Sequence, residues 1–349
     1  MDPIFQNHKI NRSIWVDGRE CLYFSGTSYL GMSASDGFAD FVNMGMQHFG
    51  VNHGLSRINN VRLSIYREFE DFFAMQAGAE MALVFSSGFL AGHAITSLLE
   101  DEADAVFIAP DTHPAVLPKA YRQHIYPNAK DWIKACQKYA DSNSGKKILI
   151  LANAVDALKP EIHDFSWIAQ LPQSNEYNLL IDDSHAFGTV GVDIFGTYPL
   201  WKRLPVRLII SGSLGKGLGI PAGIVLGDQE VIQKLSGQAV FRGASPPPPA
   251  YLWAFLNAQE IYKYQQERLN NNIVFFKSIA NGLDLHSSGQ DFPVFRSYDD
   301  RIVQNLLDSN IVISSFSYPT PNHPPVHRIV ISAWHEEKDL LDLKDALMK

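Results

Sequence analysis

The chain has 349 residues, of which 46% are hydrophobic and 19% charged, a composition typical of one large globular domain or of a large domain with a smaller one. Its net charge of -8 argues against nucleic acid or an anionic membrane as a partner. Two cysteines, Cys21 and Cys136, are too few for a disulfide framework or a cysteine-rich zinc site. With no signal-peptide pattern and no apolar run long enough to span a bilayer, we expect a cytoplasmic protein.

Strand-like and helix-like segments alternate along the first two thirds of the chain. Apolar residues recur at helical spacing over residues 66–76, 88–99 and 131–143, which predicts three helices. Short apolar runs typical of buried strands lie between and after these helices, at residues 81–85, 105–109, 147–152, 178–181 and 206–210. The alternation predicts an α/β fold, a mainly parallel sheet covered by helices.

The last third of the chain predicts a second, smaller unit. Four consecutive prolines, at 246–249, precede a long helical stretch over residues 250–281. Further strands are expected at 292–298, 311–316 and 327–333, with helices at 301–307 and 336–349. We therefore predict an N-terminal segment over residues 1–35, a large domain over 36–255 and a small C-terminal α+β domain over 256–349.

Polar residues follow the last two strands predicted for the large domain, where open parallel sheets bind their ligands. Asp182 and His185 come directly after the run 178–181, and Lys216 lies among glycines after the run 206–210. Glycines let the backbone approach a ligand closely, and the lysine amine can then reach a carbonyl. An acid, a histidine and a lysine at strand ends are the groups that a pyridoxal phosphate enzyme needs.

A site for an anion is expected where the run 81–85 meets the next helix. Ser87, Gly88 and Phe89 lie at this junction, and the first amides of a helix are unpaired and favour negative charge. A helix-capping serine with a turn glycine is the plainer interpretation of these residues alone. The glycine-rich segment around Lys216 is not a Walker motif, because Gly217 stands where Ser or Thr is required.

Other polar residues also have ordinary explanations when each is taken alone. Asp182 would be a strand-end carboxylate, His185 a structural histidine, and Arg328 a charge on an edge strand. Histidines at 323, 327 and 335 lie in a proline-rich setting without a carboxylate at ligand spacing, so we expect no metal site. The order of all these features along the chain changes their interpretation.

Six blocks of sequence, from about residue 23 to the C-terminus, resemble the motifs of the α-oxoamine synthase family of fold-type I pyridoxal phosphate enzymes. That family includes 8-amino-7-oxononanoate synthase, glycine C-acetyltransferase, 5-aminolevulinate synthase and serine palmitoyltransferase. TSYLGM at 27–32 is similar to its N-x-Y-L-G-L block, and GLSR at 54–57 with YREFE at 66–70 is similar to G-x-S-R and H-x-x-L-E. FSSGF at 85–89, DDSHAFG at 182–188, SLGK at 213–216 and RIVISAWH at 328–335 resemble the remaining four blocks, in family order.

The resemblance implies a large domain with a mainly parallel seven-stranded sheet, a small C-terminal domain, and a homodimer with its active site at the subunit interface. It implies pyridoxal 5'-phosphate as a covalent aldimine on Lys216, which would also act as the base at the substrate Cα. Asp182 would pair with the pyridine nitrogen and His185 with the 3-hydroxyl oxygen. His113 would stack on the ring face.

The remaining implied roles concern the phosphate and the substrates. The phosphate would be held by residues of two blocks, Ser87, Gly88, Phe89 and Ser213. Arg328 would bind the substrate carboxylate through its planar guanidinium. The implied reaction is a decarboxylating Claisen condensation of a small amino acid with an acyl-CoA, which gives an α-amino ketone.

The chain departs from the family pattern mainly in groups that shape the acyl-donor side. Tyr66 replaces the histidine of H-x-x-L-E, VDALKPE at 155–161 replaces V-F-S-M-D-G-D, and FRG at 241–243 replaces F-S-T. Two alternatives therefore stay open. One is a cofactor-dependent enzyme that performs transamination, aldol-type chemistry or condensation with another acyl donor, and the other is a non-catalytic homologue that binds the cofactor.

Overall fold

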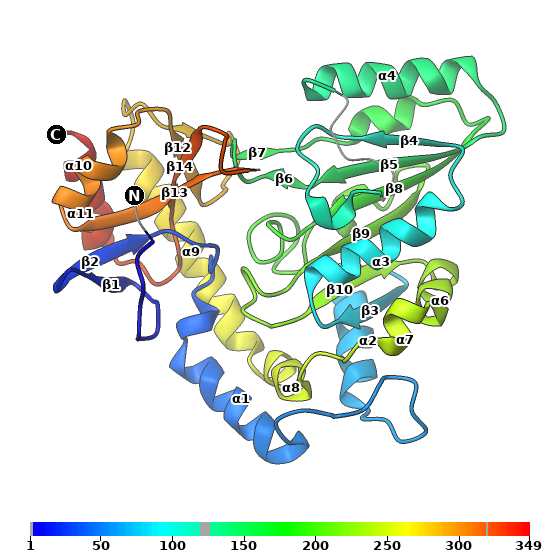
Figure 1. Cartoon of the computed structure of the whole chain (residues 1–349), viewed down its shortest axis with the longest axis horizontal. Helices are drawn as coiled ribbons and strands as arrows, with labels where there is room; N and C mark the ends of the chain where they lie inside the picture. Colours follow the sequence, from blue (N-terminus) through cyan, green and yellow to red (C-terminus); the bar gives the residue numbers. More distant parts are fainter. Residues whose placement is uncertain (1–2, 119–125, 319) are drawn as a thin grey trace.

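Two six-stranded sheets organise the residues described by the computed structural model, 3–118, 126–318 and 320–349 (Figure 1). The first sheet has the order β3 (Met81–Phe85), β10 (Gly223–Gly227), β9 (Arg207–Ser213), β8 (Glu176–Asp182), β5 (Lys147–Asn153) and β4 (Ala105–Ile108). β4, β5, β8 and β9 are parallel, whereas β10 is antiparallel to both neighbours. We expected seven strands; six lie within the described ranges, and residues 119–125, between β4 and β5, lie outside them.

Both faces of this sheet are buried. Ile148 and Ile150 of β5 face one hydrophobic core, and the alternating Leu149 and Leu151 face another. Helices α3 (Gly88–Glu100) and α6 (Gln229–Gly237) supply the second core, while α2 (Ile65–Ala77) contributes to the first. A strand buried on both faces has a continuous apolar sequence, which is why these runs predicted strands.

Polar caps set the start of several helices. Side chains accept a hydrogen bond from the first turn at Ser35 for α1 (Asp36–Phe49), Ser87 for α3, Asn128 for α4 (Ala129–Ser142) and Asp228 for α6. The other helices are α5 (Tyr198–Trp201), α7 (Ala239–Gly243), α8 (Pro249–Asn257), α9 (Gln259–Ile279), α10 (Ile302–Asp308) and α11 (Glu337–Leu347). Within the described ranges, none is both long and apolar enough to cross a membrane.

The helical stretch expected over residues 250–281 is divided into two helices. The chain forms α8 and α9, and between them Ala258 leaves helical geometry with φ -101° and ψ 22°. Leu252 and Phe255 of α8 are fully buried, so this aromatic-rich segment packs in the core of the subunit.

The second sheet joins the two ends of the chain. Its order is β1 (Ser13–Val16), β2 (Arg19–Phe24), β13 (Ile311–Ser317), β14 (Pro325–Val330), β12 (Val294–Ser297) and β11 (His286–Ser287). The N-terminal hairpin turns at Asp17 and Gly18, which both have positive φ, and β2 then pairs in parallel with β13. The strand expected at 327–333 ends earlier, at Val330. A separate hairpin, β6 (Val155–Asp156) with β7 (Glu161–Ile162), lies beside this sheet (Figure 1).

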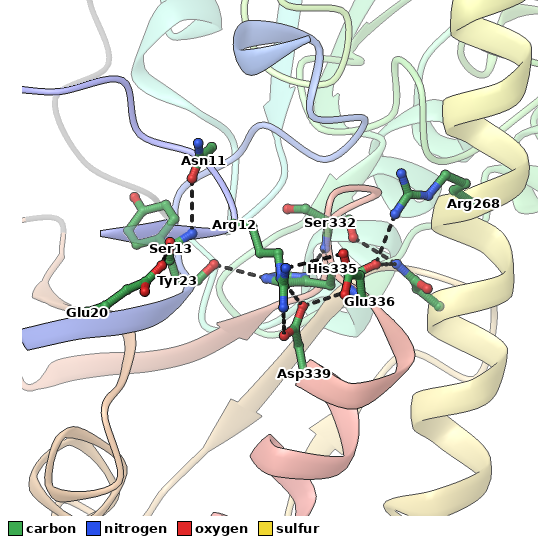
Figure 2. Close-up of polar contacts among 11 residues, drawn as sticks. Asn11, Arg12, Ser13, Glu20, Tyr23, Arg268, Ser332, His335, Glu336 and Asp339 are labelled. Atoms are coloured by element: carbon green, nitrogen blue, oxygen red, sulfur yellow. Dashed lines mark hydrogen bonds and ion pairs between the residues drawn. The ribbon is translucent and has the colours of Figure 1, made fainter. Parts of the chain in front are cut away.

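A partly buried polar cluster links the N-terminal segment to α11 (Figure 2). Arg12 donates two hydrogen bonds to Asp339, of 2.7 Å from Nε and 2.8 Å from Nη2. Beside this pair, His335 accepts the Ser332 N–H at Nδ1 over 3.0 Å and reaches the Tyr23 carbonyl from Nε2 over 3.0 Å. Both imidazole nitrogens are therefore used by the neutral ring, with its proton on Nε2.

We expect His335 to make the fold sensitive to acid. Burial lowers its pKa from 6.5 to about 4, so the unfolded chain binds a proton between these values and the folded chain does not. Stability must then fall as the pH falls through this window, by about 2 kcal/mol between pH 7 and pH 5. Urea unfolding at pH 7 and pH 5 measures this loss of unfolding free energy. The His335→Gln variant is expected to lose less stability over the same interval. An equal loss in both proteins would contradict this account.

Candidate active site

Lys216 lies on a short loop between β9 and β10, and buried neighbours fix that loop. Leu214 donates its N–H to the Ala222 carbonyl over 2.9 Å, and the Tyr262 hydroxyl donates to the Leu218 carbonyl over 2.6 Å. Gly219 has φ +66°, and a Cβ there would lie 2.8 Å from Met32. The loop is thus held close to the N-terminal segment, with Lys216 at the wall of a cavity.

That cavity has a volume of about 200 Å³ and brings together five of the residues predicted from the sequence. They are Lys216, Asp182, His185, His113 and Arg328. Their elements are far apart in the chain: β8 ends at Asp182, the Lys216 loop follows β9, and Arg328 comes from β14 in the other sheet. The cavity therefore lies between the two sheets, at the carboxyl ends of β8 and β9.

His185 connects Lys216 to a tyrosine that sequence reasoning left without a role. The His185 Nε2 lies 2.8 Å from Lys216 Nζ, and its Nδ1 lies 2.7 Å from the hydroxyl of Tyr29. Burial, then the charges of Lys216 and Arg328, hold the pKa of His185 well below 6.5. This imidazole is therefore neutral at physiological pH.

The Lys216 amine is unusually acidic for a lysine. Burial lowers its pKa to about 8, with Asp182 opposing the shift and Arg328 adding to it. At pH 7 roughly one lysine in ten is then neutral, far more than for an exposed lysine of pKa about 10.4. A neutral amine is the form that attacks a carbonyl or removes a proton.

The two adjacent acids at the end of β8 have separate surroundings. Asp182 lines the cavity, and one carboxylate oxygen accepts the Ser184 N–H over 2.8 Å. Asp183 is fully buried and accepts both the N–H and the hydroxyl of Thr197, over 2.6 and 2.8 Å. Burial raises the pKa of Asp183 to about 7. Asp183 thus fastens the chain, while Asp182 is available to a ligand.

His113 is oriented by its own backbone and by Asn153. The backbone N–H of His113 donates to Asn153 Oδ1 over 3.0 Å, and its ring Nδ1 accepts the backbone N–H of Ala115 over 3.1 Å. Asn153 also donates to Asp111, whose carboxylate lies 2.8 Å from Nε2 of His163. The His113 ring is therefore fixed at the cavity wall with its proton on Nε2.

The four residues predicted to hold a phosphate lie together, next to the cavity lining rather than in it. Ser87, Gly88 and Phe89 begin α3, and a Cβ on Gly88 would lie 2.5 Å from Ser213 Cα. Ser213 in turn donates its N–H to the hydroxyl of Ser184, over 2.8 Å, and Ser184 lines the cavity. Only glycine at position 88 allows the start of α3 to approach β9 this closely. The amides of the first turn of α3 therefore lie beside the carboxyl end of β9.

Arg328 is buried and only partly satisfied. Its Nη1 donates to the Ala157 carbonyl over 3.0 Å, and the guanidinium lies 5.0 Å from the Phe316 ring centre. Within the described residues its Nε has no hydrogen-bond partner. A buried guanidinium at the wall of a cavity is suited to a carboxylate ligand.

Several cavity residues were missed by sequence reasoning. Asn153 directly follows the run predicted as a strand at 147–152, where a search of strand ends could find it. Tyr29, which bonds to His185 but is not part of the cavity lining, lies inside the block at 27–32. Phe316, within β13, and Tyr318, directly after it, belong to none of the motifs.

One family block proved structural. Arg57, from GLSR, donates two hydrogen bonds to Glu70, of 2.8 and 2.9 Å. Glu70, from the H-x-x-L-E-like block, also accepts the Val84 N–H over 2.8 Å. These residues join the segment before α2 to β3 rather than lining the cavity.

The family model of aminotransferase class I and II matches residues 61–347. The chain belongs to this family. The chain is 28% identical to an 8-amino-7-oxononanoate synthase of Fervidobacterium nodosum, over 94% of this chain and 87% of the relative. It is 27% identical to one of Aromatoleum aromaticum, over 95% and 89%.

Solved structures share the fold. A serine palmitoyltransferase of Sphingomonas wittichii matches with a TM-score of 0.82 and 18% identity, over 99% of this chain and 92% of that one. An 8-amino-7-oxononanoate synthase of Francisella tularensis matches with a TM-score of 0.73 and 21% identity, over 94% and 96%. The resemblance to α-oxoamine synthases and the fold-type I prediction are confirmed.

Proposed function

We propose that this family member is a pyridoxal phosphate-dependent acyltransferase that condenses a small amino acid with an acyl thioester such as acyl-CoA. Coenzyme A and carbon dioxide leave, and an α-amino ketone remains. The observation that carries the proposal is the placement of Lys216, with a pKa of about 8, in one cavity with Asp182 and His185. The names of the relatives, 8-amino-7-oxononanoate synthases, support this reaction class.

The residues present fit pyridoxal phosphate. Lys216 would bind its aldehyde carbon, and the α3 amides with Ser213 would hold its phosphate beside Gly88, where no Cβ fills the space. Asp182 would keep a proton on the pyridine nitrogen, His185 would hydrogen-bond the 3-hydroxyl oxygen, and His113 would cover the ring. When bound, the cofactor supplies an electron sink for negative charge at the substrate Cα.

The chain's own groups would position the substrate and move its proton. Arg328 would bind the amino acid carboxylate with its guanidinium, which lines the same cavity as Lys216 and would place Cα near the lysine. Lys216 would remove the Cα proton, because its lowered pKa leaves the amine partly neutral near pH 7. The cavity between the sheets would keep water away from the substrate Cα once its proton has been removed.

We further propose a cytoplasmic homodimer with its active site at the subunit interface, as the family resemblance implies. Exposed apolar side chains support such an interface. Val51, Leu55, Ile58 and Val61 are exposed on the segment before α2, and Phe89 is exposed at the proposed phosphate site. Sedimentation of the purified protein tests the oligomeric state.

Release of the coenzyme A thiol tests the reaction. The cofactor-loaded protein is incubated with glycine, alanine or serine and acyl-CoA donors of increasing length. We expect thiol release that requires both substrates. An α-keto acid formed without thiol would indicate transamination, and cofactor binding without any product would indicate a non-catalytic homologue.

A further inference from the structure

Tyr29 is one of the most completely buried polar side chains at the active site. It follows β2, has no exposed surface, and packs against Phe292 with ring centres 6.0 Å apart. Its carbonyl accepts the Ala333 N–H over 2.8 Å, so the loop after β14 holds its backbone. The side chain is therefore fixed from the small sheet while its hydroxyl reaches His185.

Within the described residues, the hydroxyl of Tyr29 has a single hydrogen-bond acceptor. Burial raises its pKa well above 10, so the phenol stays protonated over the working pH range. Within the described ranges, His185 Nδ1 is its only hydrogen-bond partner. A phenol that accepted a proton from Nδ1 would leave its own O–H unpaired in the core, which is costly.

We propose that Tyr29 is a positioning residue whose hydroxyl donates to His185 Nδ1 and thereby keeps the ring proton on Nε2, facing Lys216. An Nε2–H can donate only to a lone pair, and the Lys216 amine has one only when it is neutral. The arrangement thus favours the reactive form of the lysine. This inference rests on the proposed function, because it concerns how the lysine becomes reactive.

Other charged groups face the same pair and set the background against which Tyr29 acts. Asp182, from β8, favours a protonated lysine, whereas Arg328, from β14, disfavours it. His113 and Arg328 both disfavour charge on His185. Replacing Tyr29 by Phe changes none of these charges and keeps the aromatic ring, so the variant isolates the hydroxyl.

The test measures the reactivity of Lys216 against pH. Pyridoxal phosphate is added to cofactor-free protein from pH 6 to pH 10, trapped with cyanoborohydride, and located by peptide mass spectrometry. In Tyr29→Phe the midpoint of attachment at Lys216 should move up by about 0.5–1 pH unit, the equivalent of one lost buried hydrogen bond. Tyr262→Phe is the matched control, since it removes a fully buried phenol bonded to the Lys216 loop but not to His185.

An unchanged midpoint in folded Tyr29→Phe, or the same shift in Tyr262→Phe, would overturn the proposal. A second measurement needs no variant: ¹⁵N spectra of histidine-labelled wild-type protein report which nitrogen of His185 is protonated. Protonation at Nε2 supports the proposal and protonation at Nδ1 overturns it. This spectrum does not depend on the cofactor, so it tests the inference about Tyr29 by itself. Failure of the proposed function would show separately, as an absence of pyridoxal phosphate attachment at Lys216.

Discussion

Replacing Lys216 by alanine is expected to lower kcat at least about 10³-fold, because one side chain supplies both the covalent link to the cofactor and the base at Cα. Among the residues that the structure describes, Lys216 is the only lysine that lines the cavity. Thiol release measures turnover, and the mass of the borohydride-reduced protein measures the covalent link, which should disappear from the variant.

The control for this variant is Lys263→Ala, which removes an exposed lysine of α9. It should leave both turnover and the reduced mass increment of the wild type unchanged. A Lys216→Ala protein that retained cofactor attachment at another lysine together with wild-type turnover would contradict the assignment.

Asp182→Asn is expected to lower kcat by about 10²–10³-fold, a loss typical of removing one electrostatic partner of the reacting centre. The amide oxygen can still accept the Ser184 N–H, so the local fold is kept. What is lost is the negative charge that would hold a proton on the pyridine nitrogen. Steady-state kinetics at saturating cofactor measure the effect.

The adjacent acid offers a matched control. Asp183→Asn also removes one carboxylate, but this side chain contacts Thr197 outside the cavity. We expect it to lower the free energy of unfolding by about 1–3 kcal/mol, because an amide nitrogen that cannot accept replaces one of the two oxygens that accept from Thr197, with kcat changed only a few-fold. Equal losses of kcat in the two variants would show that Asp182 acts only through the fold.

The large sheet was predictable because its strands are buried on both faces. The runs at 81–85 and 147–152 correspond to β3 and β5 within one residue. The alternation of strands with helices predicted the parallel pairing of β5 with β8, whereas β3 pairs antiparallel with β10. The pairing of β2 with β13 was not predictable in the same way. Its partners, such as Leu22 and Ile311, are nearly the whole chain apart, and no local sequence pattern specifies which strands pair over that distance.

The chemistry of the site was more predictable than its electrostatic environment. Lys216, Asp182 and His185 follow strand ends, and the carboxyl ends of parallel strands meet in space. The hydrogen bond from Tyr29 to His185 depends on how the small sheet packs on the large one, which the spacing of residues does not encode. Arg57 and Glu70, which belong to the quoted motif blocks, form a structural ion pair with each other, and the motif alone does not show whether its residues meet one another or a ligand.

A carbon balance tests the central claim most directly. The wild-type enzyme is given its preferred amino acid, labelled with ¹³C in the carboxyl group, together with an acyl-CoA, and thiol and ¹³CO₂ are quantified in the same reaction. The proposed condensation predicts equal amounts of coenzyme A and ¹³CO₂, with the amino nitrogen retained in the ketone product. Label that remains in an α-keto acid, with no coenzyme A released, would contradict it.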